Sequence, residues 1–438
     1  MGAGVILEPL VVVVLLFGGS WINRRTSAFT SQNHFRWTSD ETMRSESPDS
    51  LQSKYASPTP KDGLLSPRAV SPVSSIGIFG LSFLVTSPNT IVFEDRLLSR
   101  LLRKLPFLVE NWYWALVYWT YQLGRAFTAV TLQEGTVDVA RRHALQLVKL
   151  EEKLGMFWEL PIQRYFLRHP LAMTWINWIY SFIHIPGTIA FLVWLYYYTI
   201  TRNRVDEHQL GKTAGTVSGS PAGPLLYQAR RRTLAVCNLL AFVVFTLWPC
   251  MPPRLLSDPA AEGIEAELGR SYGFVDTVHG TKGAGSVWTE NRFCNQYAAM
   301  PSLHFGYSLM IGLTIMTIPL PSLHQRAVRF RFSHGIGLWL PSWYHLVCLV
   351  LGFLYPFVIL IAIVATANHF ILDAVAGALV CALGWRFNGV LLNLLPLEGY
   401  FLCLVRIHKP EPSENNMRYS SRDWDSDNSD ERNNALSA

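Results

Sequence analysis

Charged residues are scarce in this chain of 438 residues, where Asp, Glu, Lys and Arg make up 16% and hydrophobic residues 50%. A soluble domain usually carries about a quarter charged residues, so the shortage argues against a soluble class. The apolar residues gather into runs of about 18 to 25 residues, the length that crosses a hydrocarbon core. The sequence therefore predicts an all-α integral membrane protein.

The six cysteines form neither a CxxC pair nor a metal-ligand spacing. Most of them lie in apolar stretches, where we expect packing residues, and a disulfide between Cys250 and Cys294 stays open. The net charge of +6 comes from basic residues spread through the loops between the apolar runs. Because this distribution is typical of membrane topology signals, it argues against nucleic acid as a partner.

The first apolar run, at residues 5–17, has no Lys or Arg before it, unlike a secretory signal peptide. We interpret residues 1–22 as a signal anchor, with a wrongly assigned start as the alternative. Residues 23–75 are rich in Ser, Thr and Pro and lack periodicity, and residues 396–438 end in a polar tail. We expect both segments to be mostly disordered, the second on the cytoplasmic side.

Six apolar runs predict a six-helix transmembrane core within a catalytic domain at residues 107–395. The runs cover about 107–131, 172–199, 234–251, 303–320, 345–365 and 369–392. Residues 76–106 are expected to form an interfacial or re-entrant segment, because Ser-Pro-Asn interrupts the apolar stretch at 76–93. Whether 1–22 and 76–93 add membrane spans stays open. The loop at 133–171 has the spacing of an amphipathic helix lying on the membrane surface.

Clusters of Lys and Arg place the loops on two sides of the membrane. Residues 96–104, 201–233 and 321–344 are basic and are predicted to be cytoplasmic. The loops at 252–302 and 366–368 then fall on the lumenal or extracellular side. This orientation is typical of a multi-pass protein of the Golgi, the endoplasmic reticulum or the plasma membrane.

Three distant segments meet on that non-cytoplasmic side. Arg254 follows the third run, His304 opens the fourth, and His369 and Asp373 open the sixth. A spacing of four residues places His369 and Asp373 on one helix face, where the carboxylate can hold the imidazole in one tautomer. The helix that begins after Ser302 offers free backbone N–H groups to a phosphate, and Arg254 can add a bidentate contact.

Two histidines, a carboxylate, an arginine and a helix start suit phosphoryl transfer through a phosphohistidine. One imidazole attacks phosphorus, while the other protonates the leaving oxygen and then activates the incoming nucleophile. A metal site built from the same histidines and Asp373 is the competing interpretation. His184 and the remaining histidines lack partners at useful spacing, so we expect them to be structural or solvated.

At these motifs the chain resembles the type 2 phosphatidic acid phosphatase superfamily over roughly residues 107–395. The resemblance rests on NQYAAMPSLHFGYSL, on HFILDAVAG 65 residues after His304, on CMPPRLL and on RRHALQLVKLEEKLGMFWELPIQ. It is strongest to the inositolphosphotransferase branch, whose members make inositol phosphorylceramide. The resemblance implies a six-helix core, no metal or other cofactor, and a nucleophile at His369. It also implies that Asp373 orients His369, that His304 is the acid and base, and that Arg254 and Ser302 hold phosphate.

The chain lacks cations that the phosphatase branch carries. Leu247 stands where that branch has Lys, and Ala362 and Ile363 stand where it has Ser-Arg. The cations of the 252–302 loop that could replace them are Arg292, which we assign to the phosphate site, Arg270 and Lys282. Alternatively the substrate phosphate carries less charge, as a phosphodiester does relative to a monoester.

The predicted function is therefore transfer of a phospho-headgroup between membrane lipids, with phosphoinositol passing from phosphatidylinositol to ceramide. The main alternative is a phosphatase of lipid or isoprenoid phosphates, in which water is the acceptor. A non-catalytic membrane scaffold is the third hypothesis. The expected partners are a membrane phospholipid and a lipid acceptor or water, and the oligomeric state is not predicted.

Overall fold

The computed structural model describes most of the chain between residues 4 and 410. The described residues are 4–25, 73–78, 81–131, 135–203, 220–277, 296–321, 324, 328–331 and 337–410. The expectations of disorder at 26–72 and from 411 onward concern residues outside this set. The chain divides into a larger unit, with residues 1–23, 107–393 and 411–438, and a smaller unit, with residues 24–106 and 394–410.

The smaller unit combines segments from both ends of the chain. It contains β1 (Val73–Ile78), β2 (Leu81–Thr86), η3 (Ile91–Phe93), α2 (Leu97–Lys104) and α14 (Leu395–Leu404). The two strands pair as an antiparallel hairpin, so the stretch expected to be interfacial or re-entrant starts as a hairpin. The Tyr400 hydroxyl donates to the Thr86 carbonyl at 3.0 Å, and the His408 N–H donates to the Ser99 hydroxyl at 2.9 Å.

Helix α14 covers the first residues of the tail at 396–438. The tail was expected to be mostly disordered, and since most of its residues lie outside the described set, that expectation stays a prediction. Lys409, a few residues further on, contacts the Glu398 carboxylate of the same helix at 2.6 Å.

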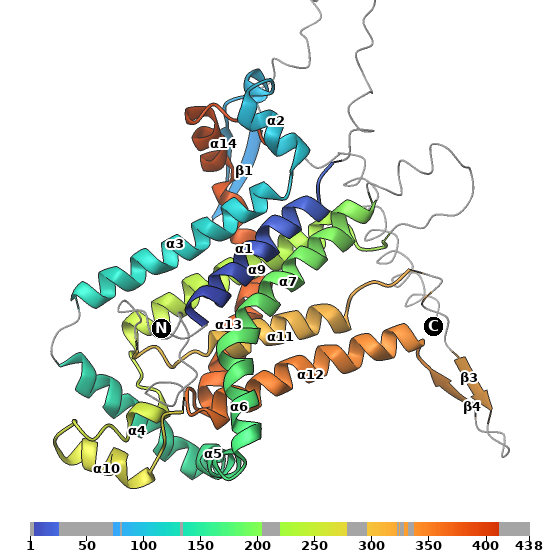
Figure 1. Ribbon diagram of the computed structural model, residues 1–438. Coiled ribbons are helices and arrows are strands. Elements are labelled where there is room, and N and C mark those ends of the chain that lie inside the picture. Colours follow the sequence, from blue (N-terminus) through green and yellow to red (C-terminus); the bar gives the residue numbers. More distant parts are fainter. Residues whose placement is uncertain are drawn as a thin grey trace, which may run out of the picture. The chain divides into compact units, whose positions relative to one another are not determined.

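The larger unit is helical, with one short hairpin among its described residues (Figure 1). Its elements are α1 (Gly4–Ile22), α3 (Leu108–Thr131), α4 (Thr136–Leu154), α5 (Glu159–Leu167), α6 (Pro170–Trp178), η4 (Ile179–Ile183), α7 (His184–Tyr196), η5 (Tyr197–Thr201), α9 (Pro224–Leu247), η6 (Pro253–Leu255), α10 (Ile264–Tyr272), α11 (Leu303–Met316), β3 (Val328–Arg331), β4 (Gly337–Leu340), α12 (Trp343–Ala365), α13 (Ile371–Phe387) and η8 (Asn388–Leu394). Each predicted span therefore contains a helix.

Three helical stretches among the described residues are long and apolar enough to cross a membrane. They are Pro170–Thr201, Trp343–Ala365 and Ile371–Leu404. The other predicted spans do not meet this criterion: α11 is apolar but has only 14 residues, and α9 carries consecutive arginines at 230–232. The chain thus has the helices of a membrane protein, while the six-helix transmembrane core stays a prediction.

A π turn, η4, interrupts the long helix that runs from α6 into α7. Pro186 lies one turn beyond it and explains the widening, because a proline ring collides with the carbonyl four residues earlier and offers no N–H to it. Such turns are frequent at functional sites. This one carries Tyr180, a residue of the candidate site described below.

Glycines bring α11 into backbone contact with both α12 and α13. A Cβ on Gly306 would lie 2.9 Å from the carbonyl oxygen of Gly377, and a Cβ on Gly377 would collide with the carbonyl of Ser302. On the α12 side, a Cβ on Gly352 would lie 2.6 Å from the carbonyl oxygen of Gly312. The close approach lets the Ser302 N–H donate to the Asp373 carbonyl at 2.9 Å.

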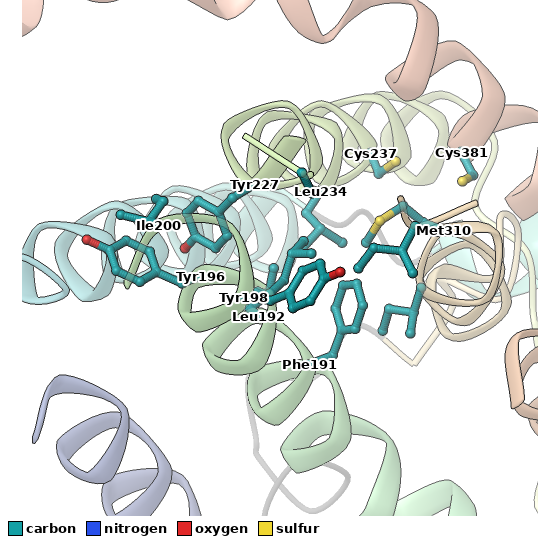
Figure 2. Packing of buried hydrophobic residues seen from close by; sticks show 14 of the residues in the cluster. Phe191, Leu192, Tyr196, Tyr198, Ile200, Tyr227, Leu234, Cys237, Met310 and Cys381 are labelled. Carbon is teal, nitrogen blue, oxygen red and sulfur yellow. The ribbon is translucent and has the colours of Figure 1, made fainter. Parts of the chain in front are cut away.

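The main apolar core lies between α7, α9, α11 and α13. Figure 2 shows Phe191, Leu234 and Met310 converging from the first three of these helices. Cys237 and Cys381 belong to the same cluster, which confirms their prediction as packing residues. Cys250 is buried as a free thiol, and its possible disulfide partner Cys294 lies outside the described residues.

A second core lies under α4, which together with α5 and α10 occupies one end of the larger unit (Figure 1). Ala140, Ala144 and Val148 of α4 are fully buried, in one cluster with Leu256 and Phe370. The amphipathic helix predicted in the 133–171 loop therefore exists. Its apolar face is covered by the protein, and not exposed for contact with a membrane surface as expected.

Replacing Gly377 by Ala should destabilise the protein, since the added methyl group meets the Ser302 carbonyl in a packed helix crossing. Overpacking of this kind costs about 1–3 kcal/mol of unfolding free energy. Thermal unfolding in detergent measures the loss. Gly389→Ala is the matched control, because a Cβ there meets no atom within 4 Å; equal unfolding temperatures of the two variants would contradict the prediction.

Candidate active site

The structure brings Arg254, His304, His369 and Asp373 together. The imidazole centroids of His304 and His369 lie 5.8 Å apart, and the Arg254 N–H donates to the carbonyl of Ala367 at 2.9 Å. The convergence that the span count predicted is therefore observed within the larger unit.

His369 is held by its Nδ1 atom. This nitrogen lies 2.7 Å from the carbonyl oxygen of Ala299, which can only accept a hydrogen bond, so the proton is on Nδ1. The opposite nitrogen, Nε2, then carries the lone pair. Ala367, two residues before, has a φ of 52°, and a non-glycine residue in this region stores strain that is frequent at functional sites.

Asp373 is completely buried in the first turn of α13. Its Oδ2 accepts the N–H of Phe370 at 2.8 Å and lies 3.6 Å from His369 Nδ1. That distance is too long for a hydrogen bond, so the carboxylate acts on the imidazole by charge. The Ala299 carbonyl makes the hydrogen bond to Nδ1, and the orienting role of Asp373 stays a prediction.

His304 lies in a row of aromatic rings. Its imidazole stacks on Tyr180 with centroids 4.7 Å apart, and His184 lies 4.9 Å away. The hydroxyl of Tyr355 is 3.1 Å from Nδ1 of His184. The sequence did not single out Tyr180, and it led us to expect His184 to be structural or solvated; His184 is buried with the Tyr355 hydroxyl as its partner. The position of His184 inside an apolar run was the signal that could have pointed to the site, since ionisable residues in such runs are costly and tend to be functional.

Ser302 caps the start of α11 and is fully buried. Its hydroxyl oxygen accepts the N–H of Phe305 at 3.4 Å, while its own N–H is bound to Asp373. The hydroxyl therefore caps α11, and the N–H joins α11 to α13. Phosphate binding by Ser302 itself stays a prediction.

Arg254 is oriented by two side chains. Its Nε donates to Asn368 Oδ1 at 2.9 Å, and its Nη1 donates to Asp276 Oδ2 at 2.9 Å. Asn368 is fixed in turn by the hydroxyl of Thr366, at 2.8 Å. The guanidinium, only 8% exposed, is thus positioned before any ligand arrives. Neither Asn368 nor Asp276 was predicted, because only the fold places them beside Arg254.

The other cations considered for the site differ in their placement. Arg270 donates to the carbonyl oxygen of Ala261 at 2.5 Å and takes part in the turn that leads into α10. Arg292 and Lys282 lie outside the described residues. Within the described part of the chain, no group of three or more His, Cys, Asp and Glu residues is arranged to hold a metal ion.

Replacing Asp276 by Asn should strengthen the binding of inorganic phosphate, because the carboxylate offsets the charge of the arginine that would receive it. Removing a unit charge near an anion in partly exposed surroundings is worth about 1 kcal/mol, or roughly a fivefold lower Kd. Isothermal titration of the purified protein measures it. Asp258→Asn is the control, since Asp258 accepts from the Ala260 N–H and not from Arg254; an unchanged Kd in Asp276→Asn would refute the idea.

Comparison with known proteins bears on this site directly. The family model described as PAP2 superfamily matches residues 145–207 and 222–327. The matched stretch contains Arg254, Ser302 and His304 and ends before His369. No curated protein and no solved structure matches the chain. The match supports placement in the PAP2 superfamily, whose members are lipid phosphatases and phosphotransferases, and with it an enzyme of this type.

Proposed function

We propose that this protein transfers a phospho-headgroup between membrane lipids through a phosphohistidine at His369, with phosphoinositol passing from phosphatidylinositol to ceramide. The observation that carries the proposal is the pair of imidazoles 5.8 Å apart beside the preoriented guanidinium of Arg254. One imidazole is held in a fixed tautomer, and the other is stacked between aromatic rings. This arrangement supplies a nucleophile, a proton carrier and a phosphate contact in one place.

In the first step, Nε2 of His369 attacks the phosphorus atom of the donor lipid. The new P–N bond forms as the bond from phosphorus to the diacylglycerol oxygen breaks, and His304, which enters this step as the imidazolium, gives that oxygen its proton. The imidazole of His369 gains positive charge during the attack. The buried carboxylate of Asp373, 3.6 Å from Nδ1, stabilises this charge.

In the second step, the hydroxyl group of the acceptor lipid takes the place of the leaving group. His304, now neutral, accepts the hydroxyl proton while the acceptor oxygen attacks phosphorus and the P–N bond breaks. The enzyme returns to its starting protonation state. Water in place of the lipid hydroxyl would give hydrolysis, so exclusion of water decides between the two outcomes.

The charge balance around Arg254 favours a phosphodiester substrate. Asp276 already neutralises part of the arginine charge, and the positions where the phosphatase branch has Ser-Arg hold Ala362 and Ile363, both fully buried in α12. Leu247, where that branch has Lys, is 76% exposed at the end of α9 and brings no charge. A phosphodiester carries one negative charge fewer than a doubly ionised monoester and needs less compensation.

The proposal includes a location. The basic segments at 96–104, 201–233 and 321–344 favour the cytoplasmic side, which would put the site on the lumenal or extracellular side of an endomembrane or of the plasma membrane. The donor and acceptor lipids would then reach the site from that leaflet.

Membranes that contain the protein should convert labelled phosphatidylinositol and ceramide into a labelled sphingolipid. Phosphatidic acid, supplied separately, should release little free phosphate, since the described residues of the site offer little positive charge for a monoester. Thin-layer separation of the lipids measures both products. Ready hydrolysis of phosphatidic acid without headgroup transfer would favour the phosphatase. Inactivity toward both donors, unchanged in His369→Ala, would favour the scaffold.

A phosphorylated enzyme intermediate should be trappable during turnover and should be acid-labile, as phosphohistidine is. It should be absent in His369→Ala, because the nucleophilic nitrogen is gone, and turnover should fall by about 10³-fold or more. His169→Ala is the control variant, since that histidine is exposed and its Nδ1 lies 2.8 Å from the Tyr165 carbonyl oxygen. Persistence of the phosphoprotein in His369→Ala would remove His369 as the nucleophile.

A further inference from the structure

The first turn of α13 is bound by carboxyl groups from three different elements. The N–H of Ile371 donates to Oε1 of Glu159 at 2.8 Å, and the N–H of Leu372 donates to Oε1 of Glu151 at 2.8 Å. The preceding N–H, of Phe370, is bound by Asp373. Three successive donors that open a helix are thus satisfied by carboxyl oxygens.

Glu151 and Glu159 reach this position from α4 and α5, more than 200 residues away in the chain, and both are completely buried. Negative charge is favourable at a helix start, but two buried carboxylates beside Asp373 repel one another. The second carboxyl oxygens of Glu151, Glu159 and Asp373 contact no donor within the described residues. The cluster therefore holds more oxygen acceptors than donors.

A proton on one of the glutamates resolves this excess. Burial, with the neighbouring Glu159 carboxyl as the next contribution, raises the pKa of Glu151 to about 9, and burial raises the pKa of Glu159 as well. Among the described residues, Asp373 also interacts with both glutamates, and the buried thiol of Cys250 interacts with Glu151. Two buried carboxyl groups side by side keep one proton between them because both cannot ionise.

The pair also controls the geometry of the candidate site. His369 lies one residue before Phe370, and Asp373 lies in the turn that the glutamates bind, so any shift of this turn moves both residues. The Ser302 N–H is attached to the same turn through the Asp373 carbonyl.

We infer that Glu151 and Glu159 are a pair of positioning residues, one of them protonated, which fixes the first turn of α13 and with it His369 and Asp373. Glu151 and Glu159 then belong to the same site as His369 and Asp373, and their role rests on the proposed function of that site. Neither residue touches the reacting atoms. Their contribution is the orientation of residues that do.

The protonation of the pair is tested by unfolding the purified protein without substrate across the pH range. The folded protein holds a proton that the unfolded chain releases above the ordinary glutamate pKa, 4.5, so Glu151 makes stability fall as pH rises from about 4.5 to about 9. Glu151→Gln removes this titration and keeps the acceptor for Leu372. The unfolding temperature of Glu151→Gln should therefore rise relative to wild type as the pH increases.

Turnover tests the positioning role. Glu151→Gln should keep near wild-type kcat at neutral pH, because an amide resembles a protonated carboxyl group, whereas Glu151→Ala should lose about tenfold in kcat with little change in KM. Glu152→Gln is the matched control, an exposed glutamate next along α4. An unfolding profile of Glu151→Gln parallel to wild type, or an equal loss of kcat in the Gln and Ala variants, would overturn the inference. Since unfolding needs no substrate, it reports on the pair even if headgroup transfer is absent.

Discussion

The crossing of α11 and α13 brings the two histidine motifs within reach of each other. At Gly306 and Gly377 the helix backbones touch, and the Ser302 N–H is bonded directly to the Asp373 carbonyl. Any larger side chain at this crossing would push the helices apart. His304 would then separate from His369, because each histidine lies within a few residues of the contact. The rest of the larger unit supports this crossing, with α12 packed on the other side of α11 through Gly312 and Gly352.

Positive charge at the site is largely offset by nearby carboxyl groups. Arg254 is paired with Asp276, and the amino-terminal turn of α13 is surrounded by buried carboxyl groups on α4, α5 and α13 itself. A site arranged in this way has little surplus positive charge among the described residues. This balance fits the phosphodiester substrate that we propose, and it fits a proton held by the buried glutamates, as we infer.

Helices α4 and α5, which precede Arg254 in the chain, contact the candidate site, which their sequence did not indicate. The 133–171 segment was predicted to be an amphipathic helix on the membrane surface, because of its apolar spacing. In the structure the apolar face of α4 covers the loop that carries Arg254, and Glu151 and Glu159 reach the start of α13. A hydrophobic pattern shows which face of a helix is buried, but it does not show what covers that face.

The sequence by itself determined the helical membrane class and the helices at the predicted spans, because the length of a hydrophobic run is a local property. It also predicted that Arg254, His304, His369 and Asp373 meet, because counting the apolar runs indicates which of their ends share a side. It did not show how many helices are long and apolar enough to cross a membrane, and it did not predict the helix at 395–404. Only the tertiary structure decided that the Ala299 carbonyl holds His369, that His184 and Tyr180 flank His304, and that Asp276 pairs with Arg254. These contacts join residues with no regular spacing, so they depend on the packing of helices and not on any pattern within one of them.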